Sequence, residues 1–161
     1  MVEEFNLKNL KEKYSILQNK YDLPSFEEMN NEFQIEKIAE FETDLILKEA
    51  RKYIIDKLFG YLRVLESIIT PSNAPMFVFA MAKALGIEER QRVIELYKKI
   101  SKLEVEIIRL DLEYSEQKEA DAIKKYYLFW KELKKEFIEI MEIINKNWDN
   151  KVEENGKGYF G

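Results

Sequence analysis

Two acidic residues interrupt an apolar helical pattern in the middle of the chain. Glu104 and Asp111 stand seven residues apart, so both project toward the same side of a helix. Apolar residues share that side: Tyr97, Ile100 and Ile107. A carboxylate among apolar side chains is costly unless it is paired, because burial disfavours its charged form. The spacing therefore predicts a cationic partner for the two acids.

The preceding apolar segment offers such a cation. Arg51 projects near Ile54 and Leu58 in a helix, and Asp44 lies about two turns before it on the same side. The candidate polar cluster is therefore Arg51, Asp44, Glu104 and Asp111. Such a group can hold a divalent cation or a small ligand between helices. It also describes an ion pair between helices, or carboxylates left in water at the edge of an apolar face, and we favour this structural explanation.

A second group combines basic residues with an aromatic ring on the outward side of one helix. It comprises Lys124, Tyr127, Lys131, Lys134 and Lys135. Such residues can grip phosphates and stack on bases. The same face also carries Glu132, Glu136 and Glu139, as a solvated helix face does. The net charge of −5 works against binding to nucleic acid or to an anionic membrane, and we expect neither as the main partner. Nucleic-acid binding through this face is the alternative hypothesis.

Aromatic residues make up 13% of the chain, which is much for a small helical domain. The candidate interface residues are Phe77, Phe79, Phe129, Trp130, Phe137 and Trp148. Exposed aromatics are enriched at interfaces, so one explanation is a face that dimerises or accepts a partner's helix. The other explanation is a wide bundle core, and the sequence favours neither.

The composition removes many reaction classes. The chain has no histidine and no cysteine, which excludes disulfides, thiolate nucleophiles, zinc–thiolate sites and the usual general base. Ferritin-like di-iron sites need histidine as well. The five glycines form no phosphate-binding loop. We therefore expect no cofactor, no metal and no catalytic residue, and lean against an enzyme.

Helical periodicity recurs along most of the 161 residues. It predicts helices over residues 3–20, 35–69 and 76–85, and a capping box at Ser25 and Glu28 starts a short helix after Pro24. Gly60 suggests a close helix crossing, and Gly86 suits the C′ position after residue 85.

Residues 87–155 contain neither glycine nor proline. The apolar stripe of residues 93–114 and that of residues 123–148 differ in direction by roughly a third of a turn. Between them lies the polar run 115–119. We favour two helices with a joint near residues 114–120 over one bent helix.

Together these patterns predict an all-α protein, an elongated antiparallel helical bundle of five or six helices, two or three of them long. We expect one domain over residues 1–149 and a flexible tail over residues 150–161. The acidic start and the lack of long apolar runs predict a cytoplasmic protein. The lysine and glutamate usage fits a thermophilic source or an A/T-rich genome. The leading hypothesis is an interaction or scaffold module that self-associates, with another protein as the alternative partner.

Overall fold

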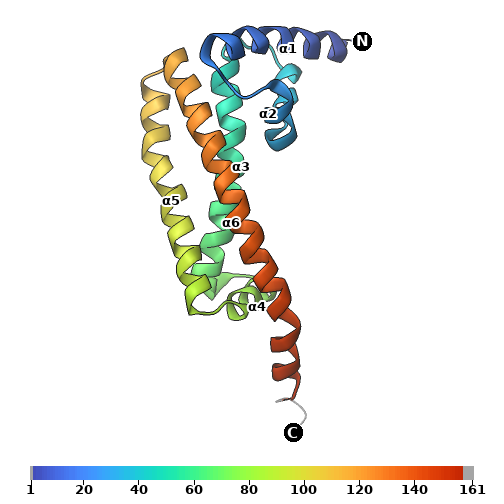
Figure 1. The fold of residues 1–161 in the computed structure, drawn as a ribbon, viewed down its shortest axis with the longest axis vertical. Coiled ribbons are helices and arrows are strands. Elements are labelled where there is room, and N and C mark those ends of the chain that lie inside the picture. The colour runs from blue at the N-terminus through green and yellow to red at the C-terminus, as the bar shows by residue number, and fades with distance from the viewer. Residues whose placement is uncertain (1, 158–161) are drawn as a thin grey trace. The chain divides into compact units, whose positions relative to one another are not determined.

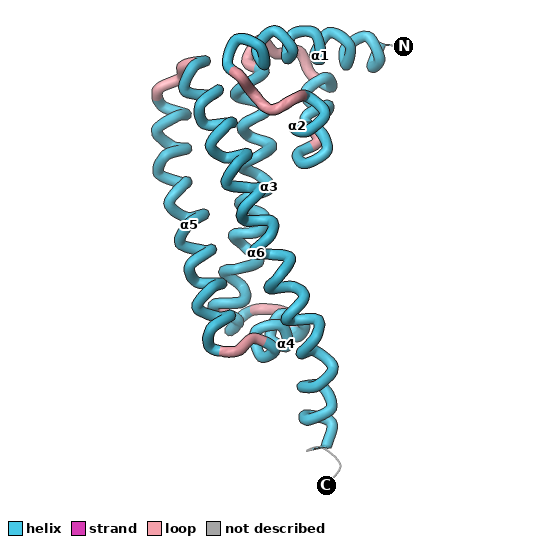
Figure 2. Tube along the Cα trace, viewed as in Figure 1, coloured by secondary structure: helices cyan, strands magenta, loops and turns pink. Residues whose placement is uncertain are grey.

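The computed structural model describes residues 2–157, and this part of the chain is helical and contains no strand (Figures 1 and 2). The all-α prediction is confirmed. The elements in chain order are α1 (Val2–Tyr21), α2 (Phe26–Phe33), the 3₁₀ helix η1 (Ile35–Glu40), α3 (Ile46–Ile69), the 3₁₀ helix η2 (Pro71–Asn73), α4 (Met76–Ala84), α5 (Ile87–Leu112) and α6 (Glu116–Lys157).

The turn between α1 and α2 forms as the sequence predicts. Ser25 has an extended backbone, its hydroxyl accepts a hydrogen bond from the Glu28 N–H, and its own N–H donates to the Glu28 carboxylate. This reciprocal pair is a capping box. The Tyr14 hydroxyl, buried on α1, donates to the Pro24 carbonyl at 2.9 Å and fixes the turn against α1.

The helix predicted over residues 35–69 is wrong in its first eleven positions. Gln34 ends α2 with φ 57°, in the left-handed region, and η1 follows for one short stretch. Phe41 is then extended, with φ −137°, and Thr43 Oγ1 accepts a hydrogen bond from the Leu45 N–H. A threonine hydroxyl bonded two residues ahead stabilises a turn rather than a helix. The long helix therefore begins at Ile46.

Neither glycine has its expected role. A Cβ added at Gly60 would have no atom within 4 Å, so this residue marks no close helix crossing. Gly86 follows Leu85, the C-cap residue of α4, and so stands at the expected C′ position, but its φ is not positive and it forms no left-handed cap. Instead the Gly86 carbonyl accepts the hydrogen bond from the Arg90 N–H, so the residue stands at the start of α5.

The segment without glycine and proline, residues 87–155, forms two helices, as the different directions of its two apolar stripes indicated. Helix α5 ends at Leu112 and α6 begins at Glu116, and Figure 2 shows the short connection as a loop. The Glu119 N–H donates to the Ser115 carbonyl and begins the new helix. At the other end α6 continues to Lys157, so the predicted tail is helical over residues 150–157, and residues 158–161 lie outside the described part.

The chain divides into two compact units. The first consists of the residues up to Leu58 together with Glu106–Trp130, and the second of Phe59–Val105 together with the residues from Lys131. Helices α3, α5 and α6 contribute residues to both units. The single domain over residues 1–149 stays a prediction.

The first unit has an aromatic interior. The rings of Tyr14 and Phe26 meet edge to face at 5.6 Å, and those of Phe33 and Trp130 at 6.0 Å. Such edge-to-face pairs add to the stabilisation from burial. The Lys57 ammonium lies 4.8 Å from the centre of the Trp130 ring. These contacts join α1 and α2 to the helices α3 and α6 of the same unit.

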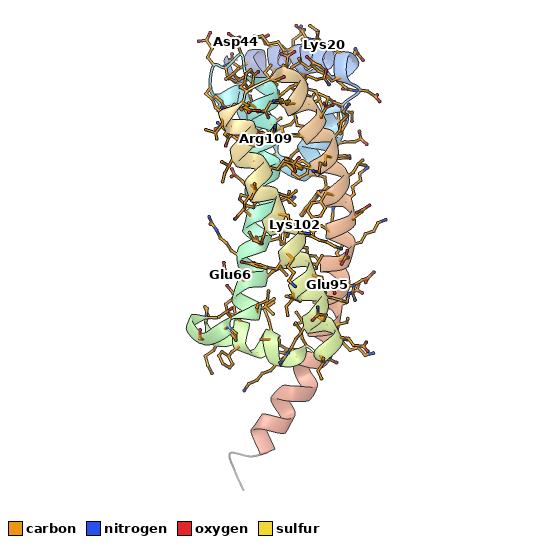
Figure 3. All side chains as sticks on the ribbon, turned by 90° about the vertical axis from the view of Figure 1, so that its left-hand side faces the viewer. Lys20, Asp44, Glu66, Glu95, Lys102 and Arg109 are labelled. Atoms are coloured by element: carbon orange, nitrogen blue, oxygen red, sulfur yellow. The ribbon has the colours of Figure 1, made fainter. Side chains whose placement is uncertain are left out.

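The second unit has a mostly aliphatic interior and carries charges on its surface. Leu65, Leu96, Ile100 and Ile140 are buried, and the rings of Tyr61 and Phe137 lie 4.8 Å apart. Figure 3 labels charged residues of both units, and those of this unit, Glu66, Glu95 and Lys102, are exposed. In Figure 1, α4 lies beside the end of α3 and the start of α5.

Candidate functional site

Part of the predicted polar cluster forms in the first unit. Arg51 on α3 is 1% exposed, and its guanidinium is bound by two carboxylates. Nε donates to Glu119 Oε2 at 2.5 Å, and one terminal nitrogen donates to Asp111 Oδ1 at 2.5 Å and to Glu119 Oε1 at 3.3 Å. Burial alone would lower the pKa of Arg51, but the hydrogen bonds with Glu119 and Asp111 outweigh it and raise that pKa. The two carboxylates therefore bind the same buried guanidinium.

The main partner of this arginine was missed from the sequence. Glu119 is completely buried, although it stands in the polar run that we expected to form a joint. The missed signal is its register, because Glu119 lies four residues before Ile123 and seven before Tyr126, on the apolar stripe of α6. A glutamate on an apolar stripe is the same anomaly that singled out Asp111.

The other two members of the predicted cluster lie elsewhere. Asp44 precedes the first residue of α3, so the helical register that would stack it under Arg51 does not exist. Its side chain is fully exposed, 3.8 Å from the Lys13 ammonium. Glu104 is exposed and belongs to the second unit. Neither carboxylate is among the hydrogen-bond partners of Arg51 in the described residues.

The structure gives the cluster no metal-binding character. Nowhere in residues 2–157 do three or more aspartates and glutamates gather as they would around a metal ion. With Arg51 bonded directly to Glu119 and Asp111, the geometry is that of a buried ion pair, in which Arg51 and Glu119 each compensate the burial of the other's charge.

The predicted lysine face loses its aromatic member. Tyr127 is 6% exposed and packs edge to face on Phe33, at 6.3 Å, so its ring cannot stack on a base. Lys124 lies 3.5 Å from Asp121. Lys131, Lys134 and Lys135 are exposed and belong to the second unit. Without an accessible ring, this face lacks the feature that distinguished it from an ordinary solvated helix face.

The six candidate interface residues divide by burial. Trp130 and Phe137 are core residues, and the Trp130 indole N–H donates to Glu32 at 2.8 Å, so both are wrong as interface predictions. Phe129 and Trp148 are half-buried. Only Phe77 and Phe79, both on α4, are exposed.

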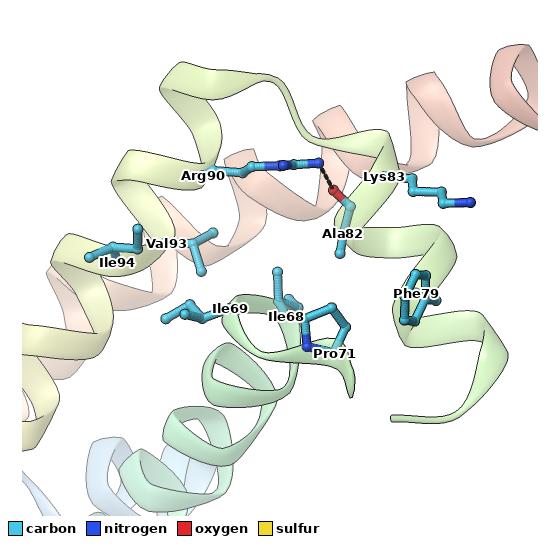
Figure 4. A pocket seen from close by; sticks show the side chains of 9 residues that line it. All are labelled: Ile68, Ile69, Pro71, Phe79, Ala82, Lys83, Arg90, Val93 and Ile94. Carbon is cyan, nitrogen blue, oxygen red and sulfur yellow. Dashed lines mark hydrogen bonds between the residues drawn. The ribbon is translucent and has the colours of Figure 1, made fainter. Parts of the chain in front are cut away.

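Beside α4 lies the apolar cavity of the second unit. It has a volume of about 300 Å³. Seven of its lining residues are apolar and two are basic: Ile68, Ile69, Pro71, Phe79, Ala82, Val93 and Ile94, with Lys83 and Arg90. Figure 4 shows Arg90 reaching from α5 to Ala82 on α4, where its guanidinium donates to the Ala82 carbonyl at 3.0 Å. Sequence reasoning missed this site, because its residues come from four separate elements, α3, η2, α4 and α5.

Another cavity, of about 400 Å³, lies in the first unit between α1 and the η1 region. Its lining mixes amides, charges and apolar groups, among them Asn6, Lys13, Glu42 and Phe41. The mixture favours no single ligand chemistry. The apolar cavity and the neighbouring face of α4 are therefore the better candidate site.

Two further findings bear on function. In the described residues, each helix is too short or too polar to cross a lipid bilayer. No family model, curated protein or solved structure matches this chain.

Proposed function

We propose that this protein is an interaction module that self-associates, and that it does so through the outer face of α4. The observation that carries the proposal is the exposure of three large apolar side chains within four residues. Met76 is 88% exposed, Phe77 59% and Phe79 42%. Large apolar patches on a folded protein mark interaction surfaces.

The charge distribution supports a second copy of the chain as the occupant. Residues 70–85 contain one charged side chain, Lys83, whereas 35% of the whole chain is charged. Depletion of charge and enrichment of methionine and aromatic residues are typical of an interface core. Two copies of the same neutral apolar face can meet around a twofold axis without repulsion between carboxylates, and such twofold dimers are the commonest oligomers.

The size of the patch sets the expected strength. Aromatic side chains bury about 150–250 Å² each, so the exposed parts of these three residues amount to roughly 300–400 Å². A standard interface buries about 800 Å² on each partner. The face of α4 would therefore form the centre of an interface completed by its polar surroundings. We expect a reversible dimer whose population rises with protein concentration.

Sedimentation equilibrium from micromolar to millimolar concentration tests this proposal. The wild-type chain should change from monomer to dimer, and Phe77→Asp should shift the transition to at least tenfold higher concentration. Ile16→Asp is the matched control, because Ile16 is 68% exposed on α1 of the first unit and should leave the transition unchanged. A wild-type chain that stays monomeric throughout, or two variants with equal effects, would overturn the proposal.

A further inference from the structure

The apolar cavity beside α4 has an unusual charge pattern. Its lining includes two basic side chains, Lys83 and Arg90, and no carboxylate. This occurs in a chain that carries five more acidic than basic residues. Arg90, which is bound there by a backbone carbonyl, can therefore receive an anion that comes from outside the lining.

Arg90 is the residue placed to receive that anion. Its hydrogen bond to the Ala82 carbonyl holds the guanidinium at the cavity, between α5 and α4 (Figure 4). A guanidinium has five N–H donors in a planar fork, and Ala82 takes one of them. The fork matches a carboxylate, with which it forms charge-assisted, bidentate hydrogen bonds. In Figure 4 the end of Lys83 points away from the space between Arg90 and Val93.

The walls and the volume define the rest of the ligand. Ile68, Ala82 and Val93 are buried and present only hydrocarbon to the cavity. A volume of 300 Å³ compares with the ~150 Å³ of an apolar cavity that holds benzene, and with ~30 Å³ for a water-sized group. The cavity therefore accommodates roughly ten non-hydrogen atoms.

We propose that this cavity binds a medium-chain carboxylate of about eight carbons, a class that octanoate represents. The hydrocarbon chain lies among Ile68, Ala82 and Val93, and the carboxylate is bound by Arg90. This is a ligand-binding function beyond self-association. Of the three residues of the proposed interface only Phe79 also lines the cavity, whereas Met76 and Phe77 do not, so the two functions can be tested separately.

Isothermal titration calorimetry with octanoate, octanol and octylamine tests the proposal on the wild-type chain. Octanoate should bind at least tenfold more tightly than octanol, because a hydrogen bond to a charged group contributes more than a neutral one. Octylamine should bind more weakly still, since its ammonium would face the Arg90 guanidinium. Equal binding of the three compounds, or no binding of octanoate, would overturn the proposal without any variant.

Variants locate the site. Arg90→Gln should reduce octanoate affinity at least tenfold and leave octanol unaffected, whereas the matched control Lys83→Gln should change octanoate affinity by less than threefold. Ile69→Trp fills the cavity and should abolish binding of both compounds. Circular dichroism shows whether each variant is folded. If a variant does not fold, the binding of the three compounds to the wild-type chain decides the outcome. An Arg90→Gln chain that binds octanoate normally would refute the assignment.

The same titration in Phe77→Asp separates this proposal from self-association. Octanoate affinity should be unchanged in this variant, because Phe77 lies outside the cavity lining. Retained binding in a monomeric variant supports the cavity site independently of the dimer. Loss of binding together with the dimer would show that the cavity requires the second copy, and would contradict the site as assigned.

Discussion

The two arginines at the centre of the candidate sites differ in the groups that bind their guanidinium. Arg51 in the first unit is 1% exposed and is bonded to Glu119 and Asp111 of its own chain. Arg90 in the second unit is exposed, donates to a backbone carbonyl, and borders a cavity without a carboxylate. An arginine that is paired within the fold compensates the burial of its carboxylate partner, so the fold depends on it. An arginine held in place without a carboxylate can receive one from a ligand.

The largest effect expected from this contrast concerns stability. Arg51→Met should lower the free energy of unfolding by about 3–5 kcal/mol, because it leaves the buried Glu119 carboxylate without its cation. Arg90→Met, the matched substitution, should cost about 1 kcal/mol, since it removes one hydrogen bond to a carbonyl. Urea unfolding followed by circular dichroism measures both. Equal losses would show that the two arginines do not differ in role.

A double variant shows whether the lost charge pairing is the cause. Arg51→Met combined with Glu119→Leu replaces the buried pair by apolar side chains of similar volume. Such replacements are often neutral or stabilising, so the double variant should recover most of the loss in Arg51→Met. A double variant as unstable as the single one would instead assign the loss to packing around residue 51.

Two buried tyrosines offer a smaller version of the same contrast. The Tyr14 hydroxyl donates to the Pro24 carbonyl, whereas the Tyr126 hydroxyl has no hydrogen-bond partner among the described residues. Burial raises the pKa of both, so each hydroxyl is protonated at neutral pH.

Tyr14→Phe should therefore cost about 1–3 kcal/mol by leaving the Pro24 carbonyl without this donor. Tyr126→Phe should be neutral or stabilise by up to about 1 kcal/mol, because it removes a hydroxyl without a partner. Thermal and urea unfolding of the two variants measure this difference in sign. A loss of stability in Tyr126→Phe would contradict the expectation and show that its hydroxyl is bonded in solution.

The fold could be predicted where one local rule decides. The all-α class follows from periodicity, and the turn at Ser25 follows from a capping box whose two partners are three residues apart. The prediction failed at residues 35–45, where periodicity continued across a turn that depends on the Thr43 hydroxyl and the left-handed Gln34. The left-handed backbone of Gln34 and the turn at Thr43 interrupt the helical pattern, and apolar spacing gives no sign of either.

Whether a candidate site could be predicted depended on how its residues are related along the chain. Arg51 and Asp111 could be named because each is a charged residue on an apolar stripe, and the structure places them in contact across 60 positions. The cavity could not be predicted, since its lining comes from the end of α3, from η2, from α4 and from the start of α5. No spacing rule relates these residues until the helices are packed.

The smallest expected effect concerns an ion pair on the surface of the first unit. Glu116 accepts hydrogen bonds from the Tyr21 hydroxyl at 2.5 Å and from the Lys20 ammonium at 2.9 Å. These bonds lower the pKa of Glu116. Its stabilisation is therefore present above the pKa of the unfolded chain, about 4.3, and is lost as the pH falls through the lower folded value.

Glu116→Gln should accordingly be less stable than the wild type at pH 7, and the difference should shrink as the pH falls below about 4. Urea midpoints measured from pH 7 to pH 3 test this. Glu12→Gln removes one exposed carboxylate from α1 without these two bonds, and it reports the effect of net charge alone. If the Glu116→Gln curve runs parallel to the wild-type curve, these surface bonds contribute nothing that depends on pH. In that case only a buried ion pair, such as that of Arg51, would affect the stability of this protein. Arg51 and Arg90 would then differ in their burial as much as in the groups that bind them.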